Sequence, residues 1–178
     1  SSYHTFFFDM ATNEPLRGET HQGFSDDSSW ARGQSWAVYG LALCYHYTHE
    51  EAILPLFERV TKYFIDHLPE DYVPYWDLIF SDGSCEPRDT SAAAIAACGI
   101  LEMEKYYHNQ EFLDIAKKMM SSLSEKYTTV DYLQSNGIIK DGMYSRKHGH
   151  KSECTSWGDY FYLEALMRMK KSDWKIYW

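Results

Sequence analysis

Three features that would assign a protein to a specialised class are scarce in this sequence. It has no run of about 18 uncharged apolar residues, which argues against a membrane-spanning helix. Lys and Arg number 17 against 26 Asp and Glu, a formal net charge of −9, so a nucleic acid is not an expected partner. The 4 cysteines show neither a CxxC pair nor metal-ligand spacing, and the first residues carry no secretion signal. We therefore expect no metal site, and we interpret the cysteines as reduced thiols of a cytoplasmic protein.

Aromatic side chains, by contrast, are abundant. They make up 17% of the 178 residues, with 15 Tyr and 6 Trp. Large aromatic rings either fill a core or line a site that stacks on a flat or weakly polar ligand, and composition does not separate these roles. The length is that of one domain or of part of a larger one.

Apolar residues recur with helical spacing in five segments, which predicts five helices. The expected helices lie at about 36–47, 51–68, 89–107, 110–127 and 158–170. Within them, Cys44 and Cys98 fall in apolar runs and are expected to be buried, and Asp89 or Thr90 is expected to cap the third helix. Residues 1–33 are expected to be extended or irregular, with a hairpin around Asn13-Glu14-Pro15, and another loop covers about 128–156.

The helices form two similar pairs. Gly40-Leu41 stands in the first pair where Gly99-Ile100 stands in the second, a shift of 59 residues. Such a repeat predicts an all-α fold of helical hairpins, at 34–68 and 89–127, followed by a last helix at 157–171. An array of this kind either closes into an α/α-barrel or remains an open solenoid. Because long loops hold most of the Trp, Gly and Asp residues, a site is expected at the loop end of the hairpins.

The densest group of polar and aromatic residues lies just before the first helix, in the segment HQGFSDDSSWARGQSW at 21–36. Arg32 stands between Trp30 and Trp36, and a guanidinium between aromatic walls suits a sugar acid, because the rings stack on the sugar and the fork binds the carboxylate. The alternative is structural. In it, Asp26, Asp27 and Ser28 cap the helix while Arg32 pairs with one of the two carboxylates.

This segment resembles the hallmark segment of the unsaturated glucuronyl hydrolases, glycoside hydrolase family 88. The resemblance extends to PYWDL at 74–78, PRDTSAAAIAACGILEM at 87–103 and WGDYFYLEALMRM at 157–169. The related rhamnogalacturonyl hydrolases typically carry Arg-Gly-Asn where this chain has Arg32-Gly33-Gln34, which favours the glucuronyl branch.

The resemblance implies that residues 1–178 are about the C-terminal half of a single (α/α)6-barrel (six-hairpin toroid) domain, with 1–33 as a substrate loop. It implies oligosaccharides left by glycosaminoglycan lyases as substrates, with a 4,5-unsaturated uronic acid at the non-reducing end. The implied reaction is protonation of C4 by an Asp and addition of water at C5, with no metal and no organic cofactor. A vinyl ether needs only one suitably tuned acid, which is consistent with this.

The resemblance also implies a set of substrate-binding residues in this chain. In it, His4 contacts the unsaturated sugar, Arg32 binds the carboxylate or its neighbouring hydroxyls, and Trp36 stacks on the ring. The full set is His4, Gly18, Thr20, Gln22, Trp30, Arg32 and Trp36 for the unsaturated sugar, with Ser145 and Lys147 for a sulfate on the second sugar. Gly142 stands where streptococcal members have a first Ser of that sulfate motif, and the alternative for residues 142–148 is a solvated loop tip.

The family's catalytic aspartates are expected upstream of the hallmark segment, and Asp9 is the only Asp ahead of Asp26. No catalytic residue is therefore expected in this chain. Two hypotheses follow: part of a glycan-degrading enzyme, or a non-catalytic α-hairpin module for carbohydrate binding or protein interaction. Open barrel edges would expose apolar faces, so we expect the N-terminal half of a barrel or a second copy as partner.

Overall fold

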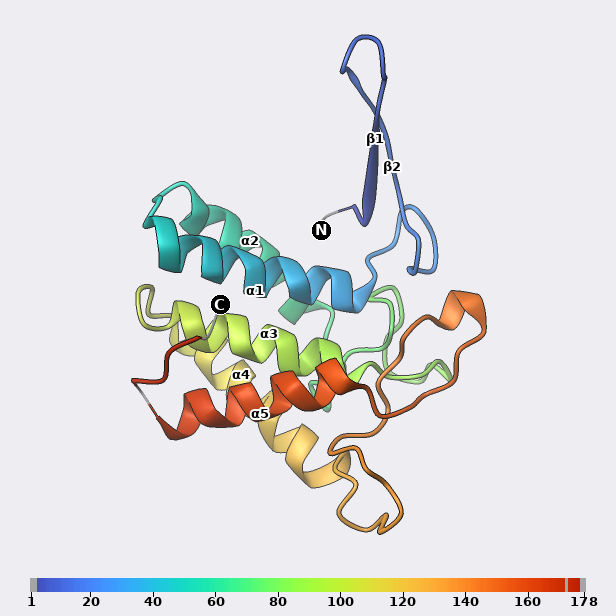
Figure 1. The fold of residues 1–178 in the computed structure, drawn as a ribbon, viewed down its shortest axis with the longest axis vertical. Coiled ribbons are helices and arrows are strands. Elements are labelled where there is room, and N and C mark those ends of the chain that lie inside the picture. Colours follow the sequence, from blue (N-terminus) through green and yellow to red (C-terminus); the bar gives the residue numbers. More distant parts are fainter. Residues whose placement is uncertain (1–2, 172, 177–178) are drawn as a thin grey trace.

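The computed structural model describes residues 3–171 and 173–176 and contains, in those ranges, a helical array with one β-hairpin (Figure 1). The strands are β1 (Thr5–Phe8) and β2 (Pro15–Glu19), paired antiparallel. The helices are α1 (Ala31–Thr48), α2 (Ile53–Asp66), α3 (Thr90–Met103), α4 (Gln110–Lys126) and α5 (Ser156–Lys170), with a short 3-10 helix η1 (Arg146–His148). The expected all-α hairpin fold is confirmed, and so is the hairpin around residues 13–15.

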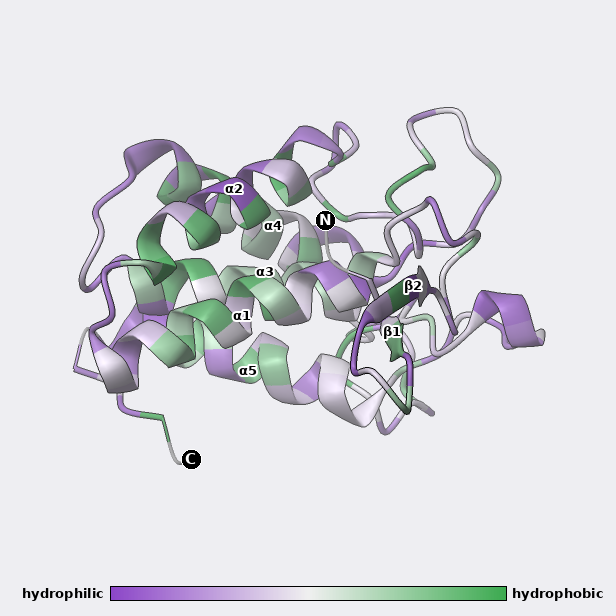
Figure 2. Ribbon diagram, turned by 90° about the horizontal axis from the view of Figure 1, so that it is seen from above, coloured by the Kyte–Doolittle hydropathy of each residue, from purple (hydrophilic) through white to green (hydrophobic). Residues whose placement is uncertain are grey.

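Helices α1, α3 and α5 lie side by side and run in the same direction, with α2 packed on α1 and α4 packed on α3 (Figure 1). The N-terminal ends of the three parallel helices therefore meet at one end of the molecule. The long loops and the hairpin gather at that same end (Figure 2). This is the loop end of the hairpins, where the sequence predicts a site.

Two helix ends differ from the sequence prediction by four residues or more, and the others agree within two residues. Helix α1 begins at Ala31 rather than near residue 36, because the amide of Ala31 donates to the carbonyl of Trp76 at 3.1 Å and Trp30 bridges to Asp77. This support comes from a distant segment, so the local apolar pattern does not contain it. Helix α3 ends at Met103 rather than near 107, and residues 104–107 continue as turns.

Helix α3 is the centre of the core, with 13 of its 14 residues buried. Its Gly99 approaches α1 so closely that a Cβ atom would lie 2.7 Å from the Tyr39 Cα. The glycine is therefore needed for backbone-to-backbone packing of neighbouring parallel helices. Gly40, its counterpart in the repeat, has no heavy atom of another segment within 4 Å of the same position. One face of α1 is thus left without the neighbour that α3 has.

A buried ion-pair network joins the C-terminal ends of the parallel helices. Glu102 of α3 is fully buried and contacts His46 of α1 at 2.8 Å and Arg168 of α5. Arg168 also pairs with Glu164 at 2.8 Å, and the Tyr39 hydroxyl donates to Glu164 at 2.9 Å. Buried charges are tolerated when they are paired in this way. The network fixes the three helices at the end opposite the loops.

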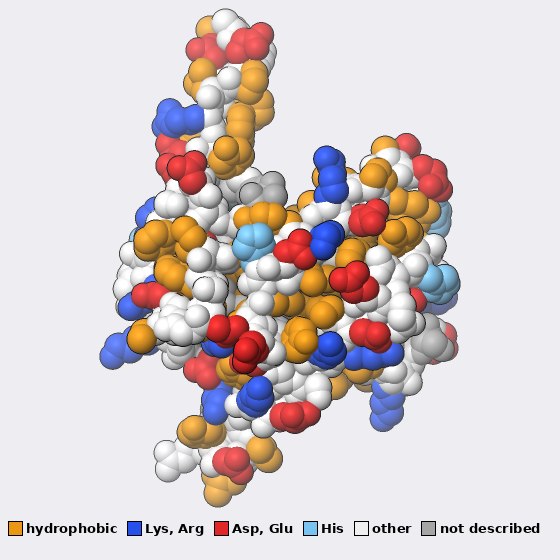
Figure 3. Space-filling model, turned by 180° about the vertical axis from the view of Figure 1, so that it is seen from behind, with side chains coloured by type: hydrophobic (Ala, Val, Ile, Leu, Met, Phe, Trp, Pro, Cys, Tyr) orange, Lys and Arg blue, Asp and Glu red, His pale blue; other side chains and the backbone are white. Residues whose placement is uncertain are grey.

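Apolar side chains remain exposed on the hairpin and on the outer edge of the array. Figure 3 shows hydrophobic side chains along the projecting hairpin, whose exposed residues include Phe6, Phe8 and Leu16. On α5 the exposed apolar residues are Tyr160, Leu163, Leu166 and Met169, which are spaced by three and form a row that winds obliquely around the helix. The expected exposure of apolar faces at open edges is confirmed.

Cys98 is buried, as predicted, but the prediction for Cys44 is wrong because its side chain is exposed. Cys44 lies one turn after Gly40, on the face of α1 that has no neighbour. An apolar run does identify a packing face, but here the partner for that face is not within the described residues.

No helix in the described ranges is both long and apolar enough to cross a membrane.

Candidate functional site

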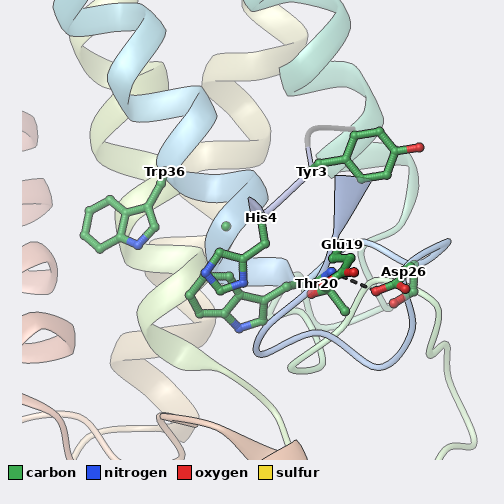
Figure 4. A pocket seen from close by; sticks show the side chains of 9 residues that line it. Tyr3, His4, Glu19, Thr20, Asp26 and Trp36 are labelled. Carbon is green, nitrogen blue, oxygen red and sulfur yellow. Dashed lines mark hydrogen bonds between the residues drawn. The ribbon is translucent and has the colours of Figure 1, made fainter. Parts of the chain in front are cut away.

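A pocket of about 390 Å³ opens at the loop end, between the first residues of α1, the start of β1 and the loop after β2. It is lined by Tyr3, His4, Glu19, Thr20, Asp26, Ser28, Trp30, Gly33 and Trp36. Figure 4 shows Trp36 on one side and Glu19, Thr20 and Asp26 on the other, with His4 between them. Aromatic walls with a few polar groups form the kind of cavity that holds a small polar ligand with apolar faces.

His4 is fixed in the pocket wall by two contacts. Its imidazole stacks on Trp30, with ring centroids 4.6 Å apart and an interplanar angle of 17°. Its Nδ1 accepts from the backbone amides of His21 and Gln22, each at 3.3 Å. An Nδ1 that accepts must be unprotonated, so the neutral imidazole is the form that fits here. Burial lowers the pKa of His4, and the charges of His21 and Arg32 lower it further.

Two aspartates shape the loop that leads into α1. Asp26 accepts from the amide of Thr20 at 2.8 Å, and the fully buried Asp77 accepts from the amide of Phe24 at 2.8 Å and from the Ser28 hydroxyl at 2.7 Å. Asp26 therefore holds the start of this loop rather than a helix end. The expectation that Asp26, Asp27 or Ser28 caps the helix is wrong, because the residue at the cap of α1 is Trp30 and no side chain makes a capping bond there.

Arg32 is 3% exposed and does not line the pocket, and its guanidinium carbon lies 4.7 Å from the ring centroid of Trp30 and 5.3 Å from that of Trp157. One terminal nitrogen donates to Asp89 at 2.7 Å and to the carbonyl of Met143 at 2.6 Å, and the other donates to the carbonyl of Tyr144 at 2.6 Å. The alternative pairing of Arg32 with Asp26 or Asp27 is therefore wrong, since its partner is Asp89.

Asp89 stands at the predicted start of α3, but its side chain does not cap the helix. It accepts instead from Arg32 and, at 2.5 Å, from the Ser91 hydroxyl. A carboxylate that is drawn into an ion pair is not free to bind the amides of the first helical turn. The capping prediction identified the right position and assigned it the wrong partner.

Residues 142–148 lie next to the loop that carries Gln22. The Gln22 side chain donates to the carbonyl of Tyr144 at 2.6 Å, and the rings of His21 and His148 are 4.9 Å apart. Ser145 is 2% exposed, and its hydroxyl is 2.6 Å from Nδ1 of His148. Lys147 lies exposed on η1. This segment is therefore joined to the rim of the pocket rather than being an isolated loop tip.

Four of the predicted binding residues, His4, Thr20, Trp30 and Trp36, line the pocket itself. Gln22, Arg32 and Ser145 lie behind its rim in the contacts described above, and Lys147 is farther out. Gly18 does not line the pocket, because the ring of Tyr3 covers it so closely that a Cβ atom would lie 2.2 Å from that ring. The binding roles of all these residues remain predictions.

Sequence reasoning did not select Tyr3 or His21 as site residues, and it did not predict the contacts that His148 and Asp89 make here. Tyr3 lines the pocket, and the two histidines join its rim to residues 142–148. The only signal in the sequence was that His21 opens the hallmark segment, because the other contacts span large separations along the chain. No group of three or more His, Cys, Asp or Glu suited to a metal ion occurs among the residues that the structure describes.

Acidification should release His4 from the turn at residues 20–22. The neutral form is favoured in the folded chain, so its contribution is complete above the ordinary pKa of 6.5 and is lost as the pH falls through the lowered pKa. NMR titration of the His4 ring, with amide exchange at residues 21 and 22, measures this. His4→Phe keeps a ring against Trp30 without the acceptor and should remove the pH dependence. A His4 pKa at or above 6.5 would contradict the prediction.

Parallel helices with an aromatic-walled pocket at their N-terminal ends match half of an (α/α)6-barrel glycan-processing enzyme. The chain belongs to glycosyl hydrolase family 88, whose profile matches residues 2–172. It is 47% identical to the unsaturated chondroitin disaccharide hydrolase of Streptococcus agalactiae serotype III (strain NEM316) over 184 aligned residues, covering 100% of this chain and 46% of that protein. The chain thus spans about half the length of the curated relatives that it matches.

Solved structures of glucuronyl hydrolases also match the chain over its whole length. The crystal structure of unsaturated glucuronyl hydrolase from Streptococcus agalactiae matches with a TM-score of 0.94 and 47% identity, over 100% of this chain and 46% of that one. An Asp-to-Asn mutant of that hydrolase in complex with dGlcA-GalNAc6S matches with a TM-score of 0.88 and 47% identity, over 100% of this chain and 48% of that one.

Proposed function

We propose that this chain forms the substrate-binding wall of an enzyme that releases 4,5-unsaturated uronic acids from glycosaminoglycan lyase products. The observation that carries the proposal is the pocket of His4, Trp30 and Trp36 at the loop end of the parallel helices. The family assignment supports it, and a relative crystallised with dGlcA-GalNAc6S indicates the class of ligand. Aromatic faces with hydrogen-bonding groups beside them suit a sugar ring.

The proposed reaction is hydration of the C4=C5 double bond. An acid delivers a proton to C4, and water adds at C5 and gives up a proton. The resulting hemiketal opens by breaking the bond from C5 to the ring oxygen, which leaves a hemiacetal at C1. Collapse of that hemiacetal breaks the bond from C1 to the oxygen of the neighbouring sugar. The residues of this chain would hold and orient the unsaturated ring, and the acid would come from outside the chain. No cofactor is required, because proton transfer alone activates a vinyl ether.

Each predicted residue has a proposed task. His4, Trp30 and Trp36 would contact the unsaturated ring, with the Thr20 hydroxyl and the backbone around Gly18 at its edge. The sequence predicts that Arg32 binds the uronate carboxylate or its neighbouring hydroxyls. Because its guanidinium is bound to Asp89 and to two carbonyls, we propose that it acts with Gln22 at the boundary with the second sugar instead. Ser145 and Lys147 would receive a sulfate on that sugar. Support for this division comes from the shared Tyr144 carbonyl, which accepts from both Arg32 and Gln22.

Binding without turnover is the expected behaviour of the chain alone. Titration with unsaturated chondroitin disaccharide should change the tryptophan fluorescence and leave the ultraviolet absorbance of the double bond unchanged. Trp36→Leu should weaken binding about tenfold, since it removes the stacking ring. Tyr132→Leu, a change of an exposed aromatic outside the pocket, is the matched control. Equal affinity in both variants would contradict the assignment of this pocket.

The alternative function is a non-catalytic α-hairpin module that binds carbohydrate or another protein. It is favoured by the same pocket, since aromatic walls with a few polar groups serve binding as well as they serve turnover. The two proposals differ in one observable, which is whether the chain contributes to turnover when the other half of a barrel is supplied.

The proposed partners are the other half of a barrel or a second copy of this chain. The proposed location, on the cysteine pattern alone, is the cytoplasm.

A further inference from the structure

We propose that Asp89 is a positioning residue of the carbohydrate site, which acts through Arg32 to hold residues 142–148 against the rim of the pocket. This inference rests on the function proposed for that pocket. Asp89 does not line the pocket, so it would not contact a sugar bound there. Its effect would pass through the guanidinium and the backbone that the guanidinium binds.

The contacts form a closed chain. Asp89 is fully buried, and its Oδ2 accepts from Arg32 at 2.7 Å. The other oxygen, Oδ1, accepts from the Ser91 hydroxyl at 2.5 Å and from the amide of Met143 at 3.4 Å. The same carboxylate therefore holds the guanidinium with one oxygen and reaches residues 142–148 with the other.

Arg32 completes the chain by donating to the carbonyls of Met143 and Tyr144, each at 2.6 Å. The Tyr144 carbonyl also accepts from Gln22, which belongs to the pocket loop. Two successive carbonyls bound to one rigid guanidinium fix both the position and the direction of the backbone that leads to Ser145. The position of the Ser145 hydroxyl relative to the pocket then depends on how Arg32 is held.

The aromatic neighbours do not fix the guanidinium by themselves. The guanidinium carbon lies 4.7 Å from the ring centroid of Trp30 and 5.3 Å from that of Trp157, and contacts of this kind do not fix the direction in which the guanidinium N–H groups point. The carboxylate of Asp89 removes that freedom because it binds one edge of the fork. Burial raises the pKa of Asp89. The positive charge of Arg32 acts in the opposite direction, because it favours the ionised carboxylate.

A purely structural role for Asp89 makes a different prediction. In that case loss of the carboxylate lowers the stability of the whole chain, and all protected amides exchange faster together. If Asp89 positions residues 142–148, their amides exchange faster than those of the remaining core. Glu102 offers a matched control, since it is also fully buried and bound to an arginine, but at the opposite end of the helices.

The test compares Asp89→Asn and Glu102→Gln with the unchanged chain by hydrogen–deuterium exchange. Measured relative to amides of α4, exchange at 142–148 should rise about tenfold in Asp89→Asn, as expected for the loss of one charge-assisted bond, and stay unchanged in Glu102→Gln. The same local change in both variants, or none in Asp89→Asn, overturns the inference. Because exchange needs no ligand, this readout stands whether or not the chain binds sugar.

Binding provides the second readout. The ratio of affinities for the 6-sulfated and unsulfated forms of unsaturated chondroitin disaccharide should fall towards one in Asp89→Asn and be kept in Glu102→Gln. An unchanged ratio in Asp89→Asn overturns the link to the second sugar. Absence of binding by the unchanged chain would instead refute the proposed function, so the two failures are distinguishable.

Discussion

Mixing this chain with the half of the Streptococcus agalactiae hydrolase that it does not span should yield activity that neither piece has alone. The family's catalytic aspartates are expected in that half, and the candidate sugar pocket lies in this one. Association would bring acid and pocket together, because the open edges of the helical array would be covered. The measurement is the loss of ultraviolet absorbance of an unsaturated chondroitin disaccharide in the mixture and in each piece.

Gly40→Leu is the control for association. Gly99 shows how closely one parallel helix packs on the next, and Gly40 holds the same place on the face of α1 that has no neighbour. A leucine there should leave the free energy of unfolding of the chain alone within about 1 kcal/mol, or raise it slightly, since glycine is a poor helix former. It should nevertheless block the recovery of activity.

The Cys44 thiol gives a readout of association that does not depend on catalysis. It is exposed on the same face of α1 and should be alkylated in the chain alone and protected in the mixture, while the exposed Cys85 reports the unprotected rate. Full activity with Gly40→Leu, or unchanged alkylation of Cys44 in an active mixture, would show that the halves join elsewhere. Turnover by this chain alone would show that it carries its own acid.

Arg168→Met should lower the free energy of unfolding by about 3–5 kcal/mol, because it leaves Glu102 and Glu164 buried without their shared cation. Burial acts to raise the pKa of Glu102, but the hydrogen bonds that Lys105 and Arg168 donate outweigh it and keep that pKa below its usual value. Without Arg168 the burial effect is less opposed. Urea unfolding followed by circular dichroism measures the difference.

Arg146→Met is the matched control, since Arg146 also pairs with a glutamate, Glu86 at 3.2 Å, but with its side chain 47% exposed. Its effect should stay below about 1 kcal/mol, because water screens the pair. Equal effects of the two substitutions would mean that the buried network adds no more than a surface contact. A loss at Arg168 alone would confirm that it joins α3 and α5.

The helices were predictable from the sequence because each presents an apolar face at regular spacing, and the repeat around Gly40 and Gly99 indicated that they form an array. The start of α1 could not be predicted in this way, because it depends on a hydrogen bond to the distant carbonyl of Trp76. The partner of Arg32 is 57 residues away at Asp89, and no local pattern reports such a pair. Cys44 was assigned to a core that needs a helix from outside the described residues.

The burial of α3 sets limits on how relatives of this chain can diverge. A helix with alanine at five of its 14 positions and almost no water-facing side accepts neither larger side chains nor charges, so its composition has to persist. The water-facing sides of α2 and α4 carry no such constraint. Across a collection of relatives, substitutions should therefore accumulate on the outer helices and leave α3 nearly unchanged, which would make α3 a better marker of common ancestry than the surface of the fold.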